Sequence, residues 1–152
     1  MCGITAISAN KEALHFLLQG LEKLEYRGYD SAGITTIENN HLFTKKAKGR
    51  LQNLKDLLKD ENVLGHVGIG HTRWATHGVP SNLNSHPHTN NDETISLVHN
   101  GIIENYRELK EILILQGYKF HSETDSEVVV HLMDYYYCLL YTSPSPRDGA
   151  TS

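Results

Sequence analysis

Leucines recur at intervals of three and four residues between Lys11 and Leu24, directly after an apolar, β-branched run at residues 2–8. The leucine spacing predicts an amphipathic helix over Lys11–Leu24, with Asn10 as its N-cap. The apolar run predicts a buried strand, because it is short and rich in β-branched side chains. A strand followed closely by such a helix indicates a fold that mixes both kinds of element.

Elements of both kinds continue along the chain. Two strands are expected on either side of Asn39-Asn40, a pair that can adopt the left-handed conformation of a tight hairpin. Gly117 follows a helical period and is expected to end that helix. The further helices expected from apolar spacing are Leu51–Leu58 and Ile103–Gln116. The two hairpin strands are Ala32–Glu38 and His41–Lys46, and the further strands expected are His66–Thr72, Glu93–Val98 and Tyr118–His121.

One long segment, Arg73–Asp92, has no periodicity and is rich in Asn, Ser, His, Pro, Gly and Thr. About twenty residues without regular structure inside a compact domain usually form a functional loop. Further along, Thr124 precedes Glu127 by three residues, which is the spacing of a capping box. We therefore expect Thr124 to cap a final helix.

Length and charge restrict the classes of protein. With 152 residues the chain has the size of one domain, and a net charge of −4 without a basic block predicts binding neither to nucleic acid nor to an anionic membrane. No apolar stretch approaches the roughly 18 residues that span a bilayer, and the N-terminus lacks the pattern of a secretory signal. Cysteines occur only at positions 2 and 138, which favours the reducing cytoplasm over a secreted, disulfide-stabilised scaffold.

The end of the chain differs from the rest. The final helix loses its polar face around Tyr135, and two of the four prolines lie at positions 144 and 146. From Thr142 onward there is no apolar periodicity, which predicts disorder. We expect residues 135–152 to be an atypical tail, disordered or non-native, that arises from a frameshift, a truncation or read-through into foreign sequence.

Cys2 has the position of an N-terminal nucleophile. If Met1 is removed, as is common before a small residue, Cys2 carries both a thiol and a free α-amine. Their reference pKa values lie near 8.5 and 8, so both groups exchange protons around neutrality and the amine can activate the thiol. The alternative is that Cys2 is a small buried apolar residue at the start of a strand.

Six sequence motifs appear in a fixed order. They are MCGI at the start, EYRGYDSAG (25–33), GHTRWATHG (70–78), NSHPH (84–88), HNGIIENY (99–106) and SETDSE (122–127). Together they resemble the glutaminase domains of glucosamine-6-phosphate synthases, which are class II, N-terminal-nucleophile glutamine amidotransferases. The resemblance covers residues 1–134 and points to this branch rather than to the phosphoribosyl amidotransferases, asparagine synthetases or glutamate synthases.

The resemblance implies a fold and a reaction. The fold is α+β, a four-layer αββα sandwich of two antiparallel sheets flanked by helices, of the N-terminal-nucleophile hydrolase type. The reaction is hydrolysis of L-glutamine through a γ-glutamyl thioester on Cys2, and the ammonia serves glucosamine 6-phosphate synthesis in the full-length enzyme. Residues 1–134 are then a glutaminase domain incomplete at its C-terminal end. The isomerase domains, which accept fructose 6-phosphate, are absent, and no metal or other cofactor is required.

The resemblance also assigns roles to residues. The Asn100 side-chain amide and the Gly101 backbone N–H stabilise the oxyanion, Arg73 binds the α-carboxylate of glutamine, and Asp125 holds its α-ammonium. The long loop contributes contacts and excludes water, and Arg27 and Asp30 shape the cysteine pocket. The loop residues concerned are Trp74, Thr76, His77 and His86.

Structural interpretations of the same residues stay open. Asn100-Gly101 is also a common turn dipeptide, Asp125 also complements a helix dipole, and Arg73 also forms surface ion pairs. Trp74 also suits an ordinary apolar core.

Two other functions also stay open. One is a metal-binding module built from His71, His77, His86 and His88, although no cysteine or paired-histidine helix motif accompanies these histidines. The other is an inactive truncated fragment or an interaction module with the glutaminase fold. Such a fragment would lack the partner domain that couples ammonia release to acceptor binding.

Overall fold

The computed structural model describes residues 2–75 and 78–142. Its helices are α1 (Ala13–Leu24), α2 (Leu51–Leu58), α3 (Tyr106–Leu115) and α4 (Glu127–Thr142), with a 3-10 turn at Glu25–Arg27. Its strands are β1 (Gly3–Ser8), β2 (Ser31–Glu38), β3 (His41–Lys48), β4 (Val67–Arg73), β5 (His88–Thr89) and β6 (Ser96–Leu97).

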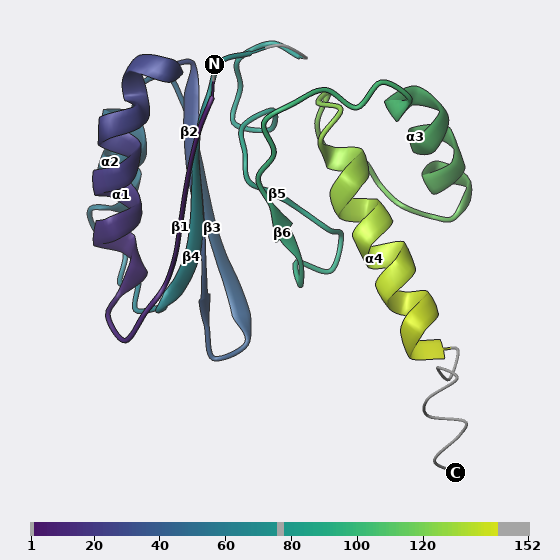
Figure 1. Cartoon of the computed structure of the whole chain (residues 1–152), viewed down its shortest axis with the longest axis horizontal. Coiled ribbons are helices and arrows are strands. Elements are labelled where there is room, and N and C mark those ends of the chain that lie inside the picture. The colour runs from purple at the N-terminus through teal and green to yellow at the C-terminus, as the bar shows by residue number, and fades with distance from the viewer. Residues whose placement is uncertain (1, 76–77, 143–152) are drawn as a thin grey trace.

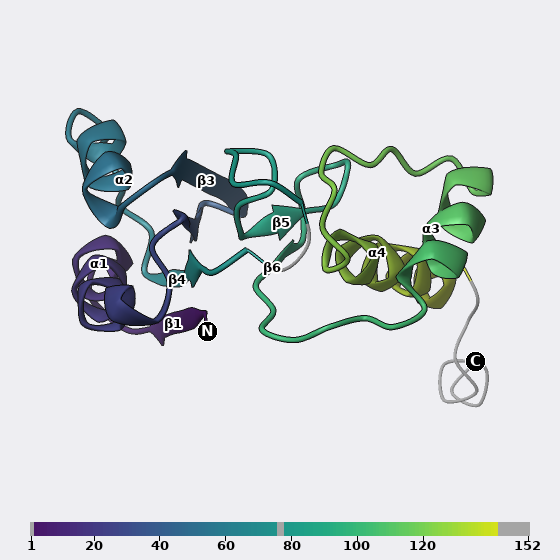
Figure 2. The ribbon, with the colours of Figure 1, turned by 90° about the horizontal axis from the view of Figure 1, so that it is seen from above.

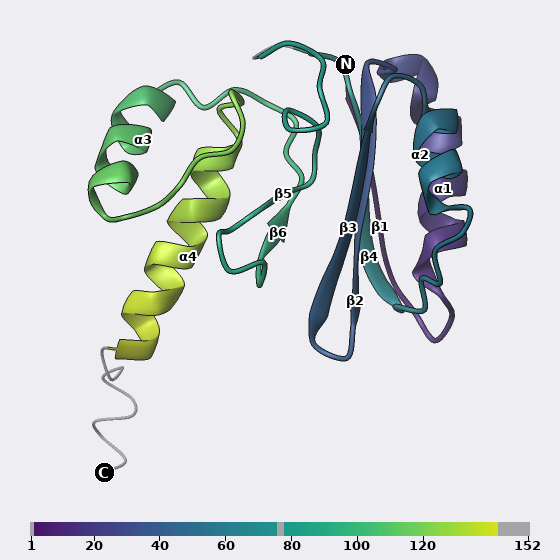
Figure 3. The same cartoon turned by 180° about the vertical axis from the view of Figure 1, so that it is seen from behind.

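These elements form four layers. Strands β1, β4, β2 and β3 make an antiparallel sheet in that order, and β5 pairs with β6 in a small antiparallel second sheet. Helices α1 and α2 lie side by side on one face of the large sheet, as Figure 1 and Figure 3 show from opposite sides. The second sheet lies against the opposite face of the large sheet, and α4 and α3 lie on the far side of the second sheet (Figure 2). The expected α+β class and αββα layer order are confirmed.

The apolar core lies between the two helices and the large sheet. Gly68 and Gly70 of β4 approach Leu17 and Leu21 of α1, so the even-numbered positions of β4 face the helices. Because strand side chains alternate, the odd-numbered positions of β4 face the second sheet. The buried cluster consists of Ala13, Leu17, Leu21, Ala32, Ile34, Ala47, Leu51, Leu54, Leu58 and Val63.

Local sequence signals account for several of these elements. Asn39 and Asn40 both adopt positive φ, 50° and 63°, so the predicted two-residue hairpin between β2 and β3 is confirmed. Helix α2 spans the residues that leucine spacing predicts. Gly117 has φ of 95° directly after the C-cap of α3, as expected for a residue that ends a helix.

Two expectations about how helices begin were wrong. Helix α1 begins after Glu12 without a side-chain cap, so Asn10 is not its N-cap. The Thr124 hydroxyl contacts His88 Nε2 at 2.7 Å, and the Thr124 N–H donates to Ser122 Oγ rather than to Glu127, so the capping box does not form. Glu127 instead accepts the backbone N–H groups of His121 and Ser122.

The second half of the chain contains less strand than expected. Residues Tyr118–His121 form no strand, because side chains already bind their backbone: Lys119 N–H donates to Asn91 Oδ1, and His121 N–H donates to Glu127. The strand expected at Glu93–Val98 shortens to β6, since Glu93 adopts positive φ inside a turn. The expected long loop contains β5 near its end.

Helix α4 continues through residues 135–142, the first part of the expected tail. Residues 143–152 lie outside the described part of the chain, so the division at residue 134 and the foreign origin of the tail stay predictions. Among residues 2–75 and 78–142, no helix is long and apolar enough to cross a membrane.

A row of histidines fills the interface between the large sheet and the second layer. His71 of β4, His86 and His88 are all nearly inaccessible. Their rings follow one another, with centroids 4.2 Å apart from His71 to His86 and 4.5 Å apart from His86 to His88. Gly33 of β2 has no side chain, and a Cβ there would collide with the His86 carbonyl. This interface is therefore closely packed but polar.

Burial keeps the three rings neutral. Desolvation lowers the pKa of His71 to about 4 and that of His88 to about 3. The pKa of His86 lies further below its ordinary value, because burial is reinforced by the neighbouring His71 and His88. The cations Lys46 and Arg73 act in the same direction, while Glu127 partly opposes them at His88.

The histidine row predicts acid-sensitive stability. An unfolded chain binds protons on these histidines below about pH 6.5, whereas the folded chain does not until its lower pKa values are reached. The stability present above pH 6.5 is therefore lost as the pH falls toward 4. For each proton that only the unfolded chain binds, the free energy of unfolding falls by about 1 kcal/mol per unit decrease in pH. Urea unfolding between pH 7.5 and 4.5 measures this slope.

Two variants test the assignment of the slope. His88→Gln removes one of the three titrations, so its slope near pH 5 is expected to be shallower by about 1 kcal/mol per pH unit. His15→Gln, on the exposed face of α1, is expected to leave the slope unchanged. A free energy of unfolding that stays flat from pH 7 to pH 5 in the unaltered chain would contradict the account.

Candidate active site

Strand pairing positions Cys2. Gly3 of β1 lies opposite Thr72 of β4, so the residue before Gly3 lies at the end of the sheet, beside Arg73 and Trp74. The Trp74 backbone N–H donates a hydrogen bond to Cys2 Sγ at 3.2 Å, and the thiol donates back to the Trp74 carbonyl at 3.6 Å. The thiol is half-buried, and it forms no disulfide with Cys138.

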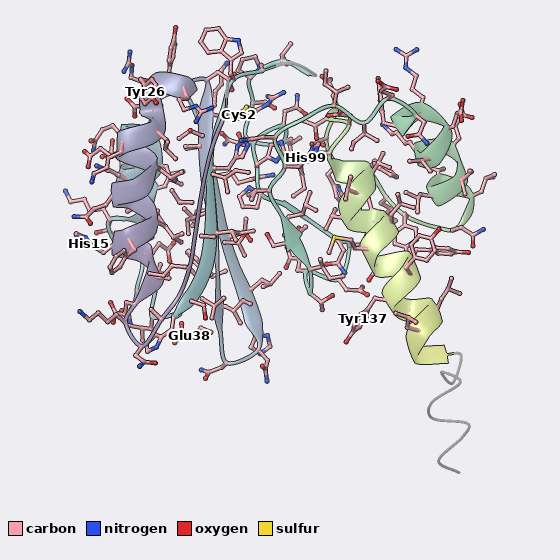
Figure 4. All side chains as sticks on the ribbon, viewed as in Figure 1. Cys2, His15, Tyr26, Glu38, His99 and Tyr137 are labelled. Carbon is pink, nitrogen blue, oxygen red and sulfur yellow. The ribbon has the colours of Figure 1, made fainter. Side chains whose placement is uncertain are left out.

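A cavity of about 330 Å³ opens beside this thiol. Two of its lining residues are labelled in Figure 4: Cys2 at the end of the large sheet and His99 in the neighbouring layer. Its walls therefore come from both halves of the sandwich. The residues that line it are Cys2, Arg27, Arg73, Trp74, His99, Asn100, Gly101, Ile102, Thr124, Asp125 and Ser126.

Asn100 connects the cavity to the sheet. Its Nδ2 donates to the Cys2 carbonyl at 3.1 Å, and its Oδ1 lies 2.7 Å from His71 Nε2. Gly101 follows in the wall of the cavity, where a Cβ would lie 2.9 Å from His99 Nε2. The two expected oxyanion residues thus lie beside Cys2, and their backbone does not form the expected alternative of a tight hairpin turn between strands.

Two charged side chains of opposite sign also line the cavity. Arg73 and Asp125 are each 3% exposed. Arg73 Nη2 donates to the Gly78 carbonyl at 3.2 Å, and Asp125 Oδ2 accepts the Ile103 N–H at 2.7 Å. Both are therefore oriented by backbone groups and are not surface ions. A guanidinium and a carboxylate in one cavity match the two charges of a free amino acid.

Trp74 and Asp30 fix the chain beside the thiol. Trp74 is 47% exposed and its ring meets Tyr29 edge to face, so the alternative of an apolar-core role is wrong for it. Asp30 Oδ2 accepts the Ala75 N–H, which fixes the segment whose Trp74 N–H points at Cys2. Arg27 lines the cavity, as expected.

One predicted residue lies outside the cavity wall, and two others cannot be placed. His86 is not among the lining residues, because its ring stacks behind the wall on His71. Thr76 and His77 lie outside the described residues. The six other predicted residues share one cavity, and their individual roles stay predictions.

Sequence reasoning missed four residues of the wall. His99 and Ile102 flank Asn100-Gly101, and Thr124 and Ser126 flank Asp125. His99 Nδ1 and Ser126 Oγ lie 3.0 Å apart, so the two motifs meet directly across the cavity wall. The sequence did contain a signal for these four residues, which is that each lies next to a predicted site residue. An irregular segment that presents one residue to a cavity often presents its sequence neighbours too.

The histidine row does not form a metal centre. Across the described residues, no group of three or more His, Cys, Asp or Glu side chains is arranged to hold a metal ion. The rings of His71 and His86 are stacked at 21°, so their nitrogens do not converge on a common point.

Comparison with known proteins agrees with this geometry. The family described as "Glutamine amidotransferase domain" matches residues 59–137. A protein of Clostridium tetani named glutamine–fructose-6-phosphate aminotransferase (isomerizing) is 62% identical over 137 residues, which is 90% of this chain and 22% of that protein. The protein of the same name from Thermosynechococcus vestitus is 53% identical over 133 residues, 88% of this chain and 21% of that one. The chain thus spans about a fifth of these relatives.

Solved structures share the fold. The glutamine phosphoribosylpyrophosphate amidotransferase of B. subtilis, complexed with ADP and GMP, has a TM-score of 0.74 at 30% identity over 88% of this chain and 29% of its own. A structure described as the allosteric regulatory enzyme of purine biosynthesis has a TM-score of 0.76 at the same identity and coverage. The chain therefore belongs to the glutamine amidotransferase domain family and has the fold of N-terminal-nucleophile hydrolases.

Proposed function

We propose that this chain is the glutaminase part of a glutamine–fructose-6-phosphate aminotransferase and hydrolyses L-glutamine to glutamate and ammonia. The observation that carries the proposal is the single cavity that contains the Cys2 thiol, the Asn100 amide, the Arg73 guanidinium and the Asp125 carboxylate. A nucleophile, an oxyanion donor and two opposite charges are what amide hydrolysis of a free amino acid requires.

In the proposed first step the Cys2 thiolate attacks the side-chain carbonyl carbon of glutamine. Removal of Met1 leaves an α-amine that takes the thiol proton. As the C–N bond breaks, this proton passes to the leaving nitrogen, so ammonia departs and a γ-glutamyl thioester remains. The Trp74 N–H, which donates to Cys2 Sγ, stabilises the thiolate before the attack.

In the second step water attacks the thioester, and the S–C bond breaks to release glutamate and restore the thiol. Negative charge develops on the carbonyl oxygen in both steps. The Asn100 amide and the Gly101 backbone N–H are the proposed donors to this oxygen. Arg73 binds the α-carboxylate and Asp125 the α-ammonium, so the two charges orient glutamine with its amide toward Cys2.

The proposed acceptor of the ammonia is fructose 6-phosphate, bound by isomerase domains in a longer protein. Support comes from the 62% and 53% identity to relatives whose name contains this substrate, against 30% for the phosphoribosylpyrophosphate enzyme. The proposed location is the cytoplasm, whose reducing conditions keep Cys2 as a thiol. Alone, the domain is expected to hydrolyse glutamine slowly and without coupling to the sugar phosphate.

Selective alkylation tests the nucleophile. A glutamine analogue with an electrophilic ketone in place of the amide is expected to form one adduct on Cys2, because only this cysteine lines the cavity. Excess L-glutamine is expected to block the adduct. Intact and peptide mass spectrometry reads the adduct and the loss of Met1 together.

Each cysteine serves as a control for the other. Cys2→Ser is expected to abolish labelling, and Cys138→Ser, on the exposed part of α4, to leave it unchanged. Labelling that L-glutamine does not block, or retention of Met1, would favour the inactive fragment or interaction module.

Asp125 gives a second test, because its proposed partner is one group of the substrate. Asp125→Asn is expected to raise the L-glutamine concentration that protects Cys2 by about 10- to 100-fold, since a hydrogen bond to a charged group contributes about 1.5–3 kcal/mol. Protection by glutaramic acid, which lacks the α-amino group, is expected to stay unchanged. The asparagine retains an oxygen for the Ile103 N–H.

The matched control is Glu123→Gln, an exposed acid two residues away and outside the cavity. It is expected to change neither protection constant. An equal loss of protection by both compounds in Asp125→Asn would show that this carboxylate does not recognise the α-ammonium.

A further inference from the structure

Asn100 lies on an irregular segment between β6 and α3, and it is exposed. Its amide group can rotate by half a turn at little steric cost, because its nitrogen and oxygen are nearly equal in size. Rotation would exchange a donor for an acceptor beside Cys2. The proposed reaction therefore needs something that fixes the amide in one orientation.

Two contacts determine that orientation. The Cys2 carbonyl only accepts hydrogen bonds, so the group 3.1 Å from it is the Asn100 nitrogen. The Asn100 oxygen then faces His71 Nε2 at 2.7 Å, and this nitrogen must carry the proton that it donates. One protonated imidazole nitrogen thus selects the rotamer of the amide.

His71 is a rigid anchor, unlike Asn100. It lies on β4, where its backbone pairs with Ile4 of β1 and with Gly33 of β2, and its side chain is 0% exposed. Its ring stacks on His86 at 4.2 Å and an interplanar angle of 21°. Neither the strand nor the ring has room to turn.

We propose that His71 is a positioning residue that holds the Asn100 amide with its N–H groups toward Cys2 and toward the developing oxyanion. This inference rests on the proposed glutaminase function. Asn100 Nδ2 has two hydrogens, of which one binds the Cys2 carbonyl and the other is directed to the substrate oxygen. In the rotated amide, an oxygen would face both the Cys2 carbonyl and the oxyanion, which repels charge where the reaction needs a donor.

The surroundings of His71 keep its ring neutral. Arg73 on the same strand and the ring of His99 disfavour a positive charge on His71, whereas hydrogen bonding to Asn100 and to the His99 backbone favours it. Burial has the largest effect of all, and the pKa of His71 is lowered to about 4. The ring therefore keeps a single proton between pH 6 and pH 8, and Nε2 carries it.

Steady-state glutaminase kinetics of two variants test the role. His71→Leu removes the donor and is expected to lower kcat about 100-fold, the usual loss when one oxyanion donor fails. KM for L-glutamine is expected to change less than threefold, because Arg73 and Asp125 remain. His71→Gln presents an amide N–H near the position of Nε2 and is expected to recover at least tenfold of the lost kcat.

Leu54→Ala is the control for general destabilisation, because Leu54 is fully buried in the apolar core on the far side of the sheet. It is expected to lower stability by roughly 3 kcal/mol and to leave kcat unchanged. Equal kcat in His71→Leu and the unaltered chain, or equal losses in the Gln and Leu variants, would overturn the inference and leave the proposed function intact.

Nuclear magnetic resonance of the full chain tests the geometry independently of turnover. The ¹⁵N signals of His71 are expected to report a neutral ring protonated at Nε2 from pH 6 to pH 8. The two Asn100 side-chain N–H signals are expected to be well separated, and to converge in His71→Leu but not in Leu54→Ala. A ring protonated at Nδ1 alone would overturn the inference. A chain with the expected signals but no glutamate release would instead contradict the proposed function.

Discussion

Antiparallel pairing of β1 with β4 determines the geometry of the cavity. Because Gly3 lies opposite Thr72, Cys2 lies at the end of the sheet beside Arg73 and Trp74. The same register turns His71 and Arg73 toward the second layer, while Gly68 and Gly70 face α1. A shift of one residue would exchange these faces and bury the guanidinium in the apolar core. The nucleophile and the residues around it thus depend on one strand pair.

The two faces of the large sheet are stabilised differently. Toward α1 and α2 the contacts are apolar, and toward the second layer they are stacked imidazoles and hydrogen bonds. Gly33 allows the segment around His86 to approach the sheet closely. A polar interface orients side chains that an apolar one would leave free to rotate, as the contact between His71 and Asn100 illustrates. The cost is stability that depends on pH.

Local patterns predicted the elements that local interactions determine. The leucine spacing predicted α2 and Asn39-Asn40 predicted the hairpin correctly, because apolar spacing and turn geometry depend on residues close together in sequence. The capping box and the strand at Tyr118–His121 failed, since partners distant in sequence, His88 and Asn91, bind the groups concerned. Motif resemblance found most of the cavity wall. It did not find that His86 lies behind the wall, because stacking is a property of the folded chain.

The central claim is that Cys2 forms a covalent γ-glutamyl intermediate, and trapping that intermediate tests it most directly. The chain is mixed with isotope-labelled L-glutamine, quenched in acid within the first turnover and digested. The account predicts a labelled γ-glutamyl thioester on the peptide that begins at Cys2, and none on the peptide that contains Cys138. Labelled glutamate released without any acyl group on Cys2, or an acyl group on another residue, would contradict it.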